Sequence, residues 1–456
     1  MKNLTTVILA AGHGKRMKSK LPKVLHQVSG QPMVKHVIDL ANAVQSDKVI
    51  CVVGHGKETV KEVLKEEKII FVEQLEQLGT GHAVMMADQY ISSGEILVLF
   101  GDAPLLSLET LEAFVEFHRK NAYGASLIST HFSDPTGYGR IIRNSDQEFI
   151  KIVEHKDATD EERKVTEINS GIGLFKAELL KDSLGKLKNE NNQGEYYLTD
   201  VFEIIRGAGH GIGAFITGDP DELMGVNDRY SLSLAEQYMQ NKILKHWMMS
   251  GVTIVSPATT YIEKNVVIGQ DTTLYPGTLL KGMTVIGEDC LIGPNADLLD
   301  VVVDSKARIK HSTLIQSHVG EKSVIGPYAY LRPGSMIGKN VKIGDFVEVK
   351  NSTIGDDSKV SHLTYVGDGI VGKNVNLGCG VVFVNYDGSK KHLTEIEDDV
   401  FVGCNSNLIA PVKIGSGAYI AAGSTITDDV PSEALAIARQ RQVNKTDWSN
   451  KYSKKK

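Results

Sequence analysis

The sequence has few cysteines, few prolines and no long apolar segment. Its cysteines, Cys51, Cys290, Cys379 and Cys404, lie far apart with no CxxC pair, which argues against a zinc ribbon or a disulfide framework and suits a reducing cytoplasm. No stretch approaches the roughly 18 apolar residues that cross a bilayer. The run Leu4–Ala11 is too short for a signal peptide and precedes a basic GKRMKSK, so we expect a buried first strand, a cytoplasmic protein and no membrane partner.

The chain also lacks an excess of positive charge. Lys and Arg total 50 against 56 Asp and Glu, a formal net charge of −6, which argues against a nucleic-acid partner. With 41% hydrophobic and 23% charged residues, the composition is that of a globular protein, and 456 residues predict two or three domains. Glycine is abundant instead, with 44 residues against 12 prolines.

Residues 1–227 alternate short apolar runs with amphipathic segments. This alternation predicts an α/β domain with a Rossmann-like, mostly parallel mixed sheet covered by helices. Between 133 and 227 the pattern is less regular, with hairpin-like pieces at GYGRIIRN and FIKIVEHKD. The expected strands are 7–11, 48–54, 69–74, 95–102 and 124–132, and the expected helices are 34–43, 59–66, 81–90 and 108–121.

Residues 228–250 predict a linker helix, because apolar residues recur there every three or four positions and the pattern ends before Gly251. The residues of this face are Leu232, Ala235, Met239, Ile243 and Trp247.

From 251 to 437 the apolar period changes to six, as in Ile262, Ile268 and Leu274. An α-helix cannot keep a six-residue period on one face, whereas a short strand plus a turn can. The pattern therefore predicts a left-handed parallel β-helix of about ten coils, with about three hexapeptides in each. Glycine often follows the apolar position, and we expect it at corners with positive φ. These glycines are Gly269, Gly287, Gly293, Gly326, Gly338, Gly344 and Gly415.

Two segments break this period. NYDGSKKHLTE, between 383 and 396, predicts an insertion projecting from one corner, a common place for function. The tail 438–456 carries seven basic residues against Asp447, and is either a solvated terminus or a clamp for a polyphosphate ligand. The basic residues are Arg439, Arg441, Lys445, Lys451, Lys454, Lys455 and Lys456.

The segment LAAGHGKRMKSKLPK at 9–23 follows the first strand. Its glycines allow a tight turn whose N–H groups face an anion, with Arg16 and Lys23 beside it, although such a turn can also be purely structural. The segment matches neither GxGxxG, the dinucleotide-binding motif, nor GxxxxGK[ST], the Walker A motif, so neither kind of nucleotide site is predicted. Asp102, at the carboxyl end of EILVLF, suits a Mg²⁺ ligand or a helix cap.

These motifs resemble the sugar-1-phosphate nucleotidyltransferases. EQLEQLGTGHA, PTGYGR, VEHKDA, EINSG, QGEYYLTD and GVN further resemble the bacterial bifunctional N-acetylglucosamine-1-phosphate uridylyltransferase and glucosamine-1-phosphate N-acetyltransferase family. The resemblance implies that Leu9, Ala10, Ala11, Gly12 and Lys23 contact the triphosphate, Gln74, Gly79 and Thr80 the uracil, and Gly139, Glu154 and Asn169 the sugar. It implies Asp102 and Asn227 as Mg²⁺ ligands, although Asn227 also suits a helix cap.

The implied reaction is in-line attack by N-acetylglucosamine 1-phosphate on the α-phosphorus of UTP, which releases pyrophosphate. The attacking phosphate is already anionic and needs no general base. The catalytic task is therefore positioning and charge neutralisation by Mg²⁺, Arg16 and Lys23.

The β-helix carries a second group of motifs: AYLRPG, EVK, SHLTYVGD, NLGCG and NYDG. Arg332 and Lys350 are 18 residues apart, one coil, and we expect an anion between these two cations. By the resemblance, His362 is the general base that removes a proton from glucosamine 1-phosphate as its amine attacks acetyl-CoA, and Glu348 orients it.

The resemblance also implies the ligand contacts of this second site. Arg332, Lys350, Tyr365, Asn376 and Lys391 would bind the sugar phosphate. We interpret Cys379 and Cys404 as packing residues rather than nucleophiles, although they fall at coenzyme-binding positions. Members of the family form homotrimers that share acetyltransferase sites. The implied acetyl-CoA contacts are Cys379, Asn385, Tyr386, Cys404, Ala422 and Arg439.

The sequence thus predicts a two-reaction enzyme that makes UDP-N-acetylglucosamine, a bacterial cell-wall precursor. One alternative is a nucleotidyltransferase whose β-helix only oligomerises or senses an effector, and another is a scaffold that has lost catalysis. The SHLTYVGD motif and the insertion argue against the first alternative, and the presence of Lys23, Asp102, Asn227 and His362 argues against the second.

Overall fold

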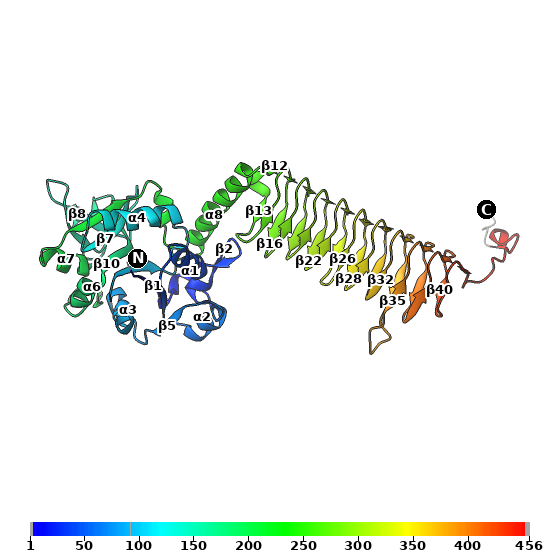
Figure 1. Cartoon of the computed structure of the whole chain (residues 1–456), viewed down its shortest axis with the longest axis horizontal. Coiled ribbons are helices and arrows are strands. Elements are labelled where there is room, and N and C mark those ends of the chain that lie inside the picture. Colours follow the sequence, from blue (N-terminus) through cyan, green and yellow to red (C-terminus); the bar gives the residue numbers. More distant parts are fainter. Residues whose placement is uncertain (1–2, 92, 452–456) are drawn as a thin grey trace. The chain divides into compact units, whose positions relative to one another are not determined.

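The computed structural model describes residues 3–91 and 93–451. The chain divides into two compact units, one ending at Asn241 and the other beginning at Lys242. Each unit is described by itself (Figure 1).

The first unit is built on a nine-stranded mixed sheet in the order β11-β7-β10-β6-β1-β4-β5, with β8 and β9 beside β10. Strand β10 runs antiparallel to both neighbours on this path, whereas β1, β4, β5 and β6 pair in parallel. The predicted hairpin forms as β8 and β9. The strands are β1 (Leu4–Ala10), β4 (Lys48–Val53), β5 (Ile70–Glu73), β6 (Glu95–Phe100), β7 (Ala125–His131), β8 (Gly139–Arg143), β9 (Phe149–Val153), β10 (Glu167–Lys176) and β11 (Ile212–Ile216).

Helices cover both faces of this sheet. Successive side chains of a strand point to opposite faces, and since the strands are apolar on both faces, each face needs a cover of helices. Ile8 of β1 belongs to the apolar cluster under α1, α2 and α4, and Val7 belongs to the cluster under α3, α6 and α7. The predicted helix at 81–90 is shorter than expected, since α3 ends at Met85 and a 3-10 turn covers Asp88–Tyr90. The helices are α1 (Met33–Ala43), α2 (Lys57–Val63), α3 (Thr80–Met85), α4 (Leu108–Lys120), α5 (Asp160–Arg163), α6 (Ala177–Leu184) and α7 (Asp200–Gly207).

Helix α8 (Arg229–Met249) contributes to both units. In its first half, Leu232, Ala235 and Met239 pack with Val28 and Leu105 of the first unit. In its second half, Ile243, Leu244 and Trp247 pack on the core of the second unit. The apolar face predicted for this helix is therefore divided between two cores.

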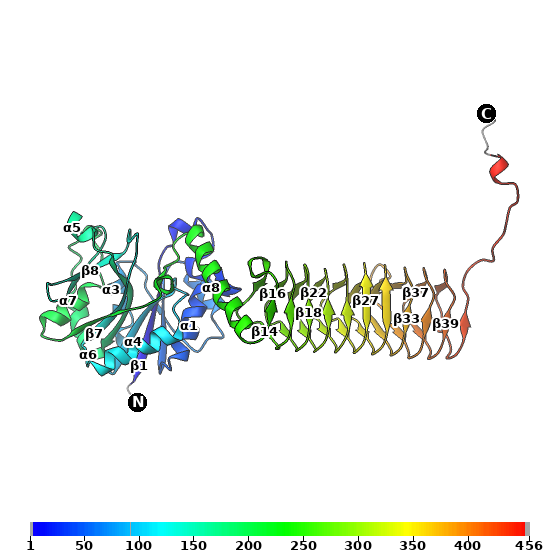
Figure 2. The ribbon, with the colours of Figure 1, turned by 90° about the horizontal axis from the view of Figure 1, so that it is seen from above.

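The second unit is a left-handed parallel β-helix whose short strands stack into three parallel sheets (Figures 1 and 2). The sheets contain 11 strands from β12 (Thr253–Ile254) to β41 (Leu435–Ala436), 10 from β13 (Tyr261–Ile262) to β40 (Thr425–Ile426), and 9 from β14 (Val267–Ile268) to β38 (Val412–Ile414). The apolar residues that recur at about every sixth position are buried together in one continuous core.

The slips in the six-residue period are shortened corners. Leu298 and Val303, for example, are five residues apart, yet both are inward and fully buried. Paired residues of successive coils are therefore 16, 17 or 18 positions apart, as in Asp297–Thr313, Val285–Val302 and Val267–Val285, except for 20 in Thr253–Thr273 and 25 where the insertion intervenes, as in Gly369–Thr394.

The positive-φ prediction for the corner glycines is correct at Gly293 and Gly326 and wrong at the other five. Those five have glycine for lack of space: a Cβ on Gly344 would lie 1.9 Å from the Ser361 carbonyl oxygen of the next coil. Many of the left-handed corner positions hold short polar residues that tolerate them, although Tyr328, Phe346 and Leu363 also have positive φ. The short polar residues include Asp271, Asp289, Asn340, Asp357, Asn374 and Asp399.

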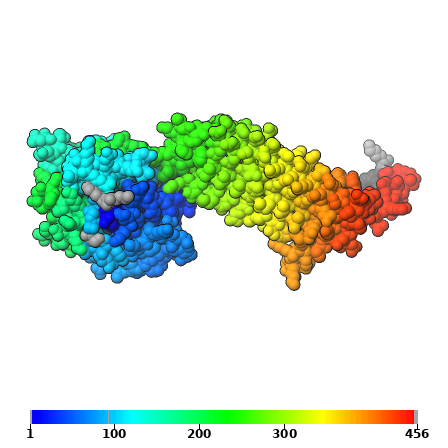
Figure 3. Space-filling model, in the orientation of Figure 1, coloured from blue at the N-terminus to red at the C-terminus, as the bar shows by residue number. Residues whose placement is uncertain are grey.

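The insertion forms a hairpin, residues 385–393, that protrudes from the β-helix (Figure 3). Its strands meet in an antiparallel bridge between Tyr386 and Lys391. In the tail, residues 438–451 are exposed, and the ammonium groups of Lys445 and Lys451 each lie 5.4 Å from the Trp448 ring. Lys454, Lys455 and Lys456 lie outside the described residues. In the described part of the chain, no helix meets the length and apolarity needed to cross a membrane.

Candidate active sites in the two units

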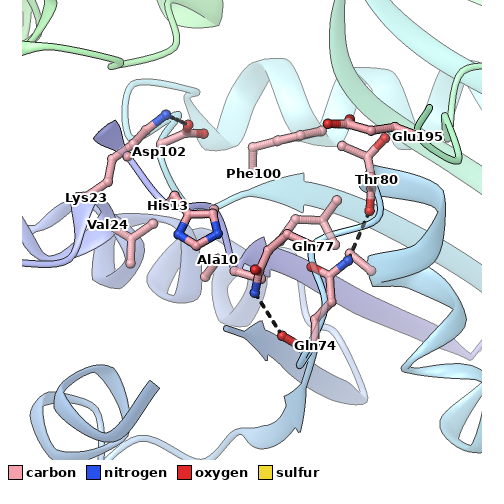
Figure 4. A pocket seen from close by; sticks show the side chains of 16 residues that line it. Ala10, His13, Lys23, Val24, Gln74, Gln77, Thr80, Phe100, Asp102 and Glu195 are labelled. Atoms are coloured by element: carbon pink, nitrogen blue, oxygen red, sulfur yellow. Dashed lines mark hydrogen bonds and ion pairs between the residues drawn. The ribbon is translucent and has the colours of Figure 1, made fainter. Parts of the chain in front are cut away.

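A cavity of about 370 Å³ lies at the carboxyl ends of β1, β5 and β6 in the first unit (Figure 4). This edge is where open α/β sheets bind ligands. The structure brings nine of the predicted residues together in its lining: Leu9, Ala10, Ala11, Gly12, Lys23, Gln74, Gly79, Thr80 and Asp102.

The residues predicted to contact the uracil are held by a tight turn before α3. Gln74 is buried, and its amide nitrogen donates to the Gly79 carbonyl at 3.1 Å. Gly79 has φ of 113°, and a Cβ there would lie 2.6 Å from the Tyr196 carbonyl oxygen, so only glycine fits. The Thr80 hydroxyl accepts from the Leu198 N–H at 3.1 Å.

Lys23, Asp102 and Asn227 meet at one end of this cavity. The Lys23 ammonium forms an ion pair with an Asp102 carboxylate oxygen and donates to Asn227 Oδ1 at 2.7 Å. The two oxygens predicted to hold a metal therefore converge on a single cation. In the residues that the structure describes, no three His, Cys, Asp or Glu residues cluster as a metal site, so other ligands of a metal here would be phosphate and water.

The sugar-side residues form a second group at β8, β9 and β10. Asn169 pairs with Gly139 across the sheet, and a Cβ on Gly139 would lie 3.5 Å from the Glu154 carboxylate. Burial raises the pKa of Glu154, although the Thr199 hydroxyl donates to it at 3.1 Å. Arg16 is exposed in the 3-10 turn Lys15–Met17 and is outside the cavity lining.

Sequence reasoning missed six residues of the cavity lining: His13, Val24, Gln77, Ala83, Phe100 and Glu195. His13 stands between the two glycines of the loop, and its ring lies 5.0 Å from that of His55. Phe100, to which the sequence assigned no role, fills the space beside Gly171 on the sugar side. The position of Phe100 directly before Gly101-Asp102 was the available signal.

In the second unit, His362 is paired with Asp345 of the preceding coil. The distance between His362 Nδ1 and Asp345 Oδ1 is 2.6 Å, and the side chains are 55% and 37% exposed. Because a carboxylate accepts, Nδ1 carries the proton and Nε2 is free. The hydrogen bond from His362 lowers the pKa of Asp345. The prediction that Glu348 orients His362 is wrong, since Glu348 pairs with Arg332 at 2.8 Å.

A cationic group lies on the neighbouring sheet. Arg332 and Lys350 stack one coil apart as predicted, but each has a carboxylate partner, so no anion is needed between them. Lys350 is 3.9 Å from Asp368. The Lys350 ammonium lies against that of Lys391 and lowers the pKa of Lys391. Two adjacent ammonium groups favour a dianionic ligand such as a phosphate.

Tyr365 is on the same sheet, where it pairs with Glu348. A Cβ on Gly367 would lie 2.3 Å from the Tyr365 hydroxyl oxygen, so the end of the Tyr365 ring occupies the space beside this glycine. Asn376 aligns with Lys359 on the sheet that carries His362.

Four of the predicted residues form a column along one corner. The register of the coils stacks His362, Cys379, Cys404 and Ala422 in that order. Arg439 follows at the end of the column, where a Cβ placed on Gly423 would lie 3.8 Å from the Arg439 Cδ. The interpretation of the cysteines as packing residues is wrong, because Cys404 is exposed and Cys379 is only half-buried.

The hairpin 385–393 carries the remaining predicted residues. Asn385 donates to Asp368 at 2.5 Å, on the side of the cationic group rather than in the column. Tyr386 is exposed, and its hydroxyl donates to the Gly388 carbonyl at 2.7 Å. Asp387, which the sequence did not single out, accepts from the N–H groups of Ser389 and Lys390 at 2.7 and 2.6 Å and so shapes the hairpin.

Comparison with known proteins places both units in one family. The family model for the MobA-like NTP transferase domain matches residues 6–157, and that for the GMPPB C-terminal domain matches residues 316–413. The bifunctional protein GlmU of Clostridioides difficile (strain 630) is 53% identical, with 99% of each chain covered.

Further relatives carry the same name. The GlmU protein of Alkaliphilus oremlandii is 56% identical with 98% of each chain covered, and that of Caldanaerobacter subterraneus is 54% identical with 100% of this chain and 99% of the relative covered. The chain therefore belongs to the GlmU family of bifunctional proteins, the uridylyltransferase and acetyltransferase family that its motifs resemble.

Proposed function

We propose that this chain makes UDP-N-acetylglucosamine in two steps, acetylating glucosamine 1-phosphate in the β-helix and then joining uridylate to the product in the first unit. The observation that carries the proposal is the pairing of His362 with Asp345 in the same unit as the adjacent Lys350 and Lys391 ammonium groups, in a chain that also has a cavity of about 370 Å³. UTP and acetyl-CoA are cytoplasmic metabolites, so we place the enzyme in the cytoplasm.

In acetyl transfer, His362 Nε2 removes a proton from the 2-amino group as the amine attacks the thioester carbon, and CoA leaves as the thiol. Asp345 fixes the Nδ1–H tautomer and faces the imidazolium that forms. Arg332, Lys350 and Lys391 bind the phosphate. Acetyl-CoA follows the corner column from Cys379 to Arg439, a placement supported by the stacking of these residues beyond His362.

In uridylyl transfer, the loop of residues 9–14 receives the triphosphate, and Gln74, Gly79 and Thr80 receive the base. Gly139, Glu154 and Asn169 bind the sugar. Lys23 neutralises charge on the phosphates, and Arg16 contributes from the mouth of the loop. The sugar phosphate attacks the α-phosphorus, and pyrophosphate leaves.

We place Mg²⁺ at Asp102 and Asn227. The donor set fits a hard cation, because a carboxylate and an amide oxygen converge on one positive charge in the Lys23 ammonium. The bound metal would supply charge neutralisation at the reacting phosphates.

One assay with two variants tests the proposal. The full chain is incubated with UTP, Mg²⁺, acetyl-CoA and glucosamine 1-phosphate, while CoA and UDP-N-acetylglucosamine are measured separately. Lys23→Ala is expected to abolish the UDP-sugar and leave CoA release intact, and His362→Ala the reverse when N-acetylglucosamine 1-phosphate is supplied. A wild-type chain that releases no CoA would support the alternative of a non-catalytic β-helix.

We also propose a homotrimer. In the β-helix, the outer face of the sheet from β14 to β38 carries a column with exposed apolar residues, among them Val267, Val285, Val302, Met336 and Ile370. Exposed apolar residues that recur along one face, here between polar residues such as His318 and Thr353, suit a protein interface. Sedimentation velocity should give about three times the chain mass of 49.7 kDa, and a mass near that of one chain would contradict the proposal.

A further inference from the structure

The proposed reaction does not account for the contact of Lys23 with the two proposed metal ligands. Sequence reasoning places Lys23 on the triphosphate, yet its ammonium is bound to Asp102 and Asn227 (Figure 4 shows the Asp102 contact). We infer that Lys23 occupies the metal position in the nucleotide-free enzyme and must leave before a divalent cation can bind Asp102 and Asn227. This inference deepens the proposed function and rests on its metal site.

The metal position stays assembled when Lys23 leaves, because backbone contacts hold the two ligands. The Val226 N–H donates to the Asp102 carbonyl at 2.9 Å, which ties the segment before Asn227 to the end of β6. The Asn227 N–H donates to the Ser231 hydroxyl at 3.0 Å, in the first turn of α8. The lysine is therefore not the element that brings the two oxygens together.

The Lys23 ammonium is held by Asp102 and Asn227, but it can move because its stem can rotate. A Cβ placed on Gly14, in the loop that would receive the triphosphate, would lie only 2.6 Å from the Lys23 Cβ. The four-carbon stem is flexible, and the side chain is 13% exposed and borders the cavity. A rotation about this stem carries the ammonium from the two oxygens to the phosphates.

The two cations exclude each other. Mg²⁺ binds oxygen at about 2.0–2.1 Å, so a metal on these oxygens would stand within a few ångströms of an ammonium donating to the same atoms. The repulsion is strong in a half-buried site. A triphosphate removes it by attracting the lysine and by adding oxygen ligands for the metal. Metal and nucleotide should consequently bind with positive coupling, and metal alone should bind weakly.

The experiment measures metal binding without nucleotide or activity. Mn²⁺ is titrated into the full chain, and free Mn²⁺ is read from its electron paramagnetic resonance signal. Lys23→Met removes the ammonium and keeps the stem. The matched control is Lys35→Met, because Lys35 is also a half-buried lysine with two acceptors, Asp39 at 2.5 Å and Glu67 at 2.9 Å, but on α1.

Lys23→Met is expected to bind Mn²⁺ at least tenfold more tightly than the wild type, whereas Lys35→Met stays within twofold. Adding Asp102→Asn to Lys23→Met should remove the gain. An affinity of Lys23→Met within twofold of the wild type, or a gain that survives Asp102→Asn, would overturn the inference, and so would the absence of binding in both proteins. Failure of the proposed function is seen separately, as no Mg²⁺-dependent UDP-sugar formation by the wild type.

Discussion

Replacing Asp345 by Asn tests whether the His362 pair performs acetyl transfer. The substitution keeps the shape and an acceptor oxygen for the Nδ1–H, but removes the negative charge 2.6 Å from the imidazole. Since His362 lowers the pKa of Asp345, the carboxylate is ionised throughout a neutral assay range, and the variant lacks this charge at every pH tested. The imidazolium formed as the amine loses its proton is then less stabilised.

The expected loss is about tenfold in kcat. A positioned general base contributes about 10²- to 10⁴-fold, and its partner supports only part of that. The pair is also exposed to solvent, 55% for His362 and 37% for Asp345, which screens their charges. His362→Ala should remove the whole contribution and lose at least a hundredfold.

The assay follows CoA release at saturating acetyl-CoA and glucosamine 1-phosphate. Asp304→Asn is the matched control, because it breaks another His–Asp pair of the β-helix, with His318 at 3.2 Å, away from the reacting residues. Uridylyl transfer by the same preparations should be unchanged. A kcat for Asp345→Asn within twofold of the wild type would refute the assignment, and so would an equal loss in Asp304→Asn.

Three other substitutions test separate parts of the structure. Lys391→Gln removes one of two adjacent ammonium groups and should raise KM for glucosamine 1-phosphate severalfold with a smaller change in kcat; an unchanged KM would contradict the role of the Lys350–Lys391 pair. Burial raises the pKa of Asp200 from 3.8 to about 6, so ionisation of Asp200 destabilises the fold as pH rises through this interval. Asp200→Asn should therefore raise the free energy of unfolding by about 1 kcal/mol at pH 7.5, after discounting for solvent screening, and leave it unchanged at pH 3.5, as measured by thermal unfolding. Gly344→Ala has no space for its Cβ and should destabilise the β-helix by about 3 kcal/mol, whereas Gly207→Ala, at the end of α7 with nothing within 4 Å, should not lower the melting temperature, because alanine favours a helix over glycine.

The six-residue period predicted the β-helix because inward positions cannot vary freely. Ile286, Ile292 and Leu298 are each at most 2% exposed, so a polar residue there would be buried without a partner. The corners obey no such rule. A corner can lose one residue without moving the inward side chains, and where this happens depends on backbone geometry that side-chain periodicity does not record. The reason for corner glycine was missed likewise, since the space for a Cβ depends on the next coil.

That freedom at the corners explains why the partner of His362 was missed. A strict 18-residue coil places Gly344, rather than Asp345, beside His362. The corner between Val349 and Ile354 is one residue short, and this shift brings Asp345, 17 residues away, into register with His362. Glu348 is then free to bind Arg332. The proposed general base can thus be predicted from its motif, but its partner belongs to another coil and depends on the length of the corner between them.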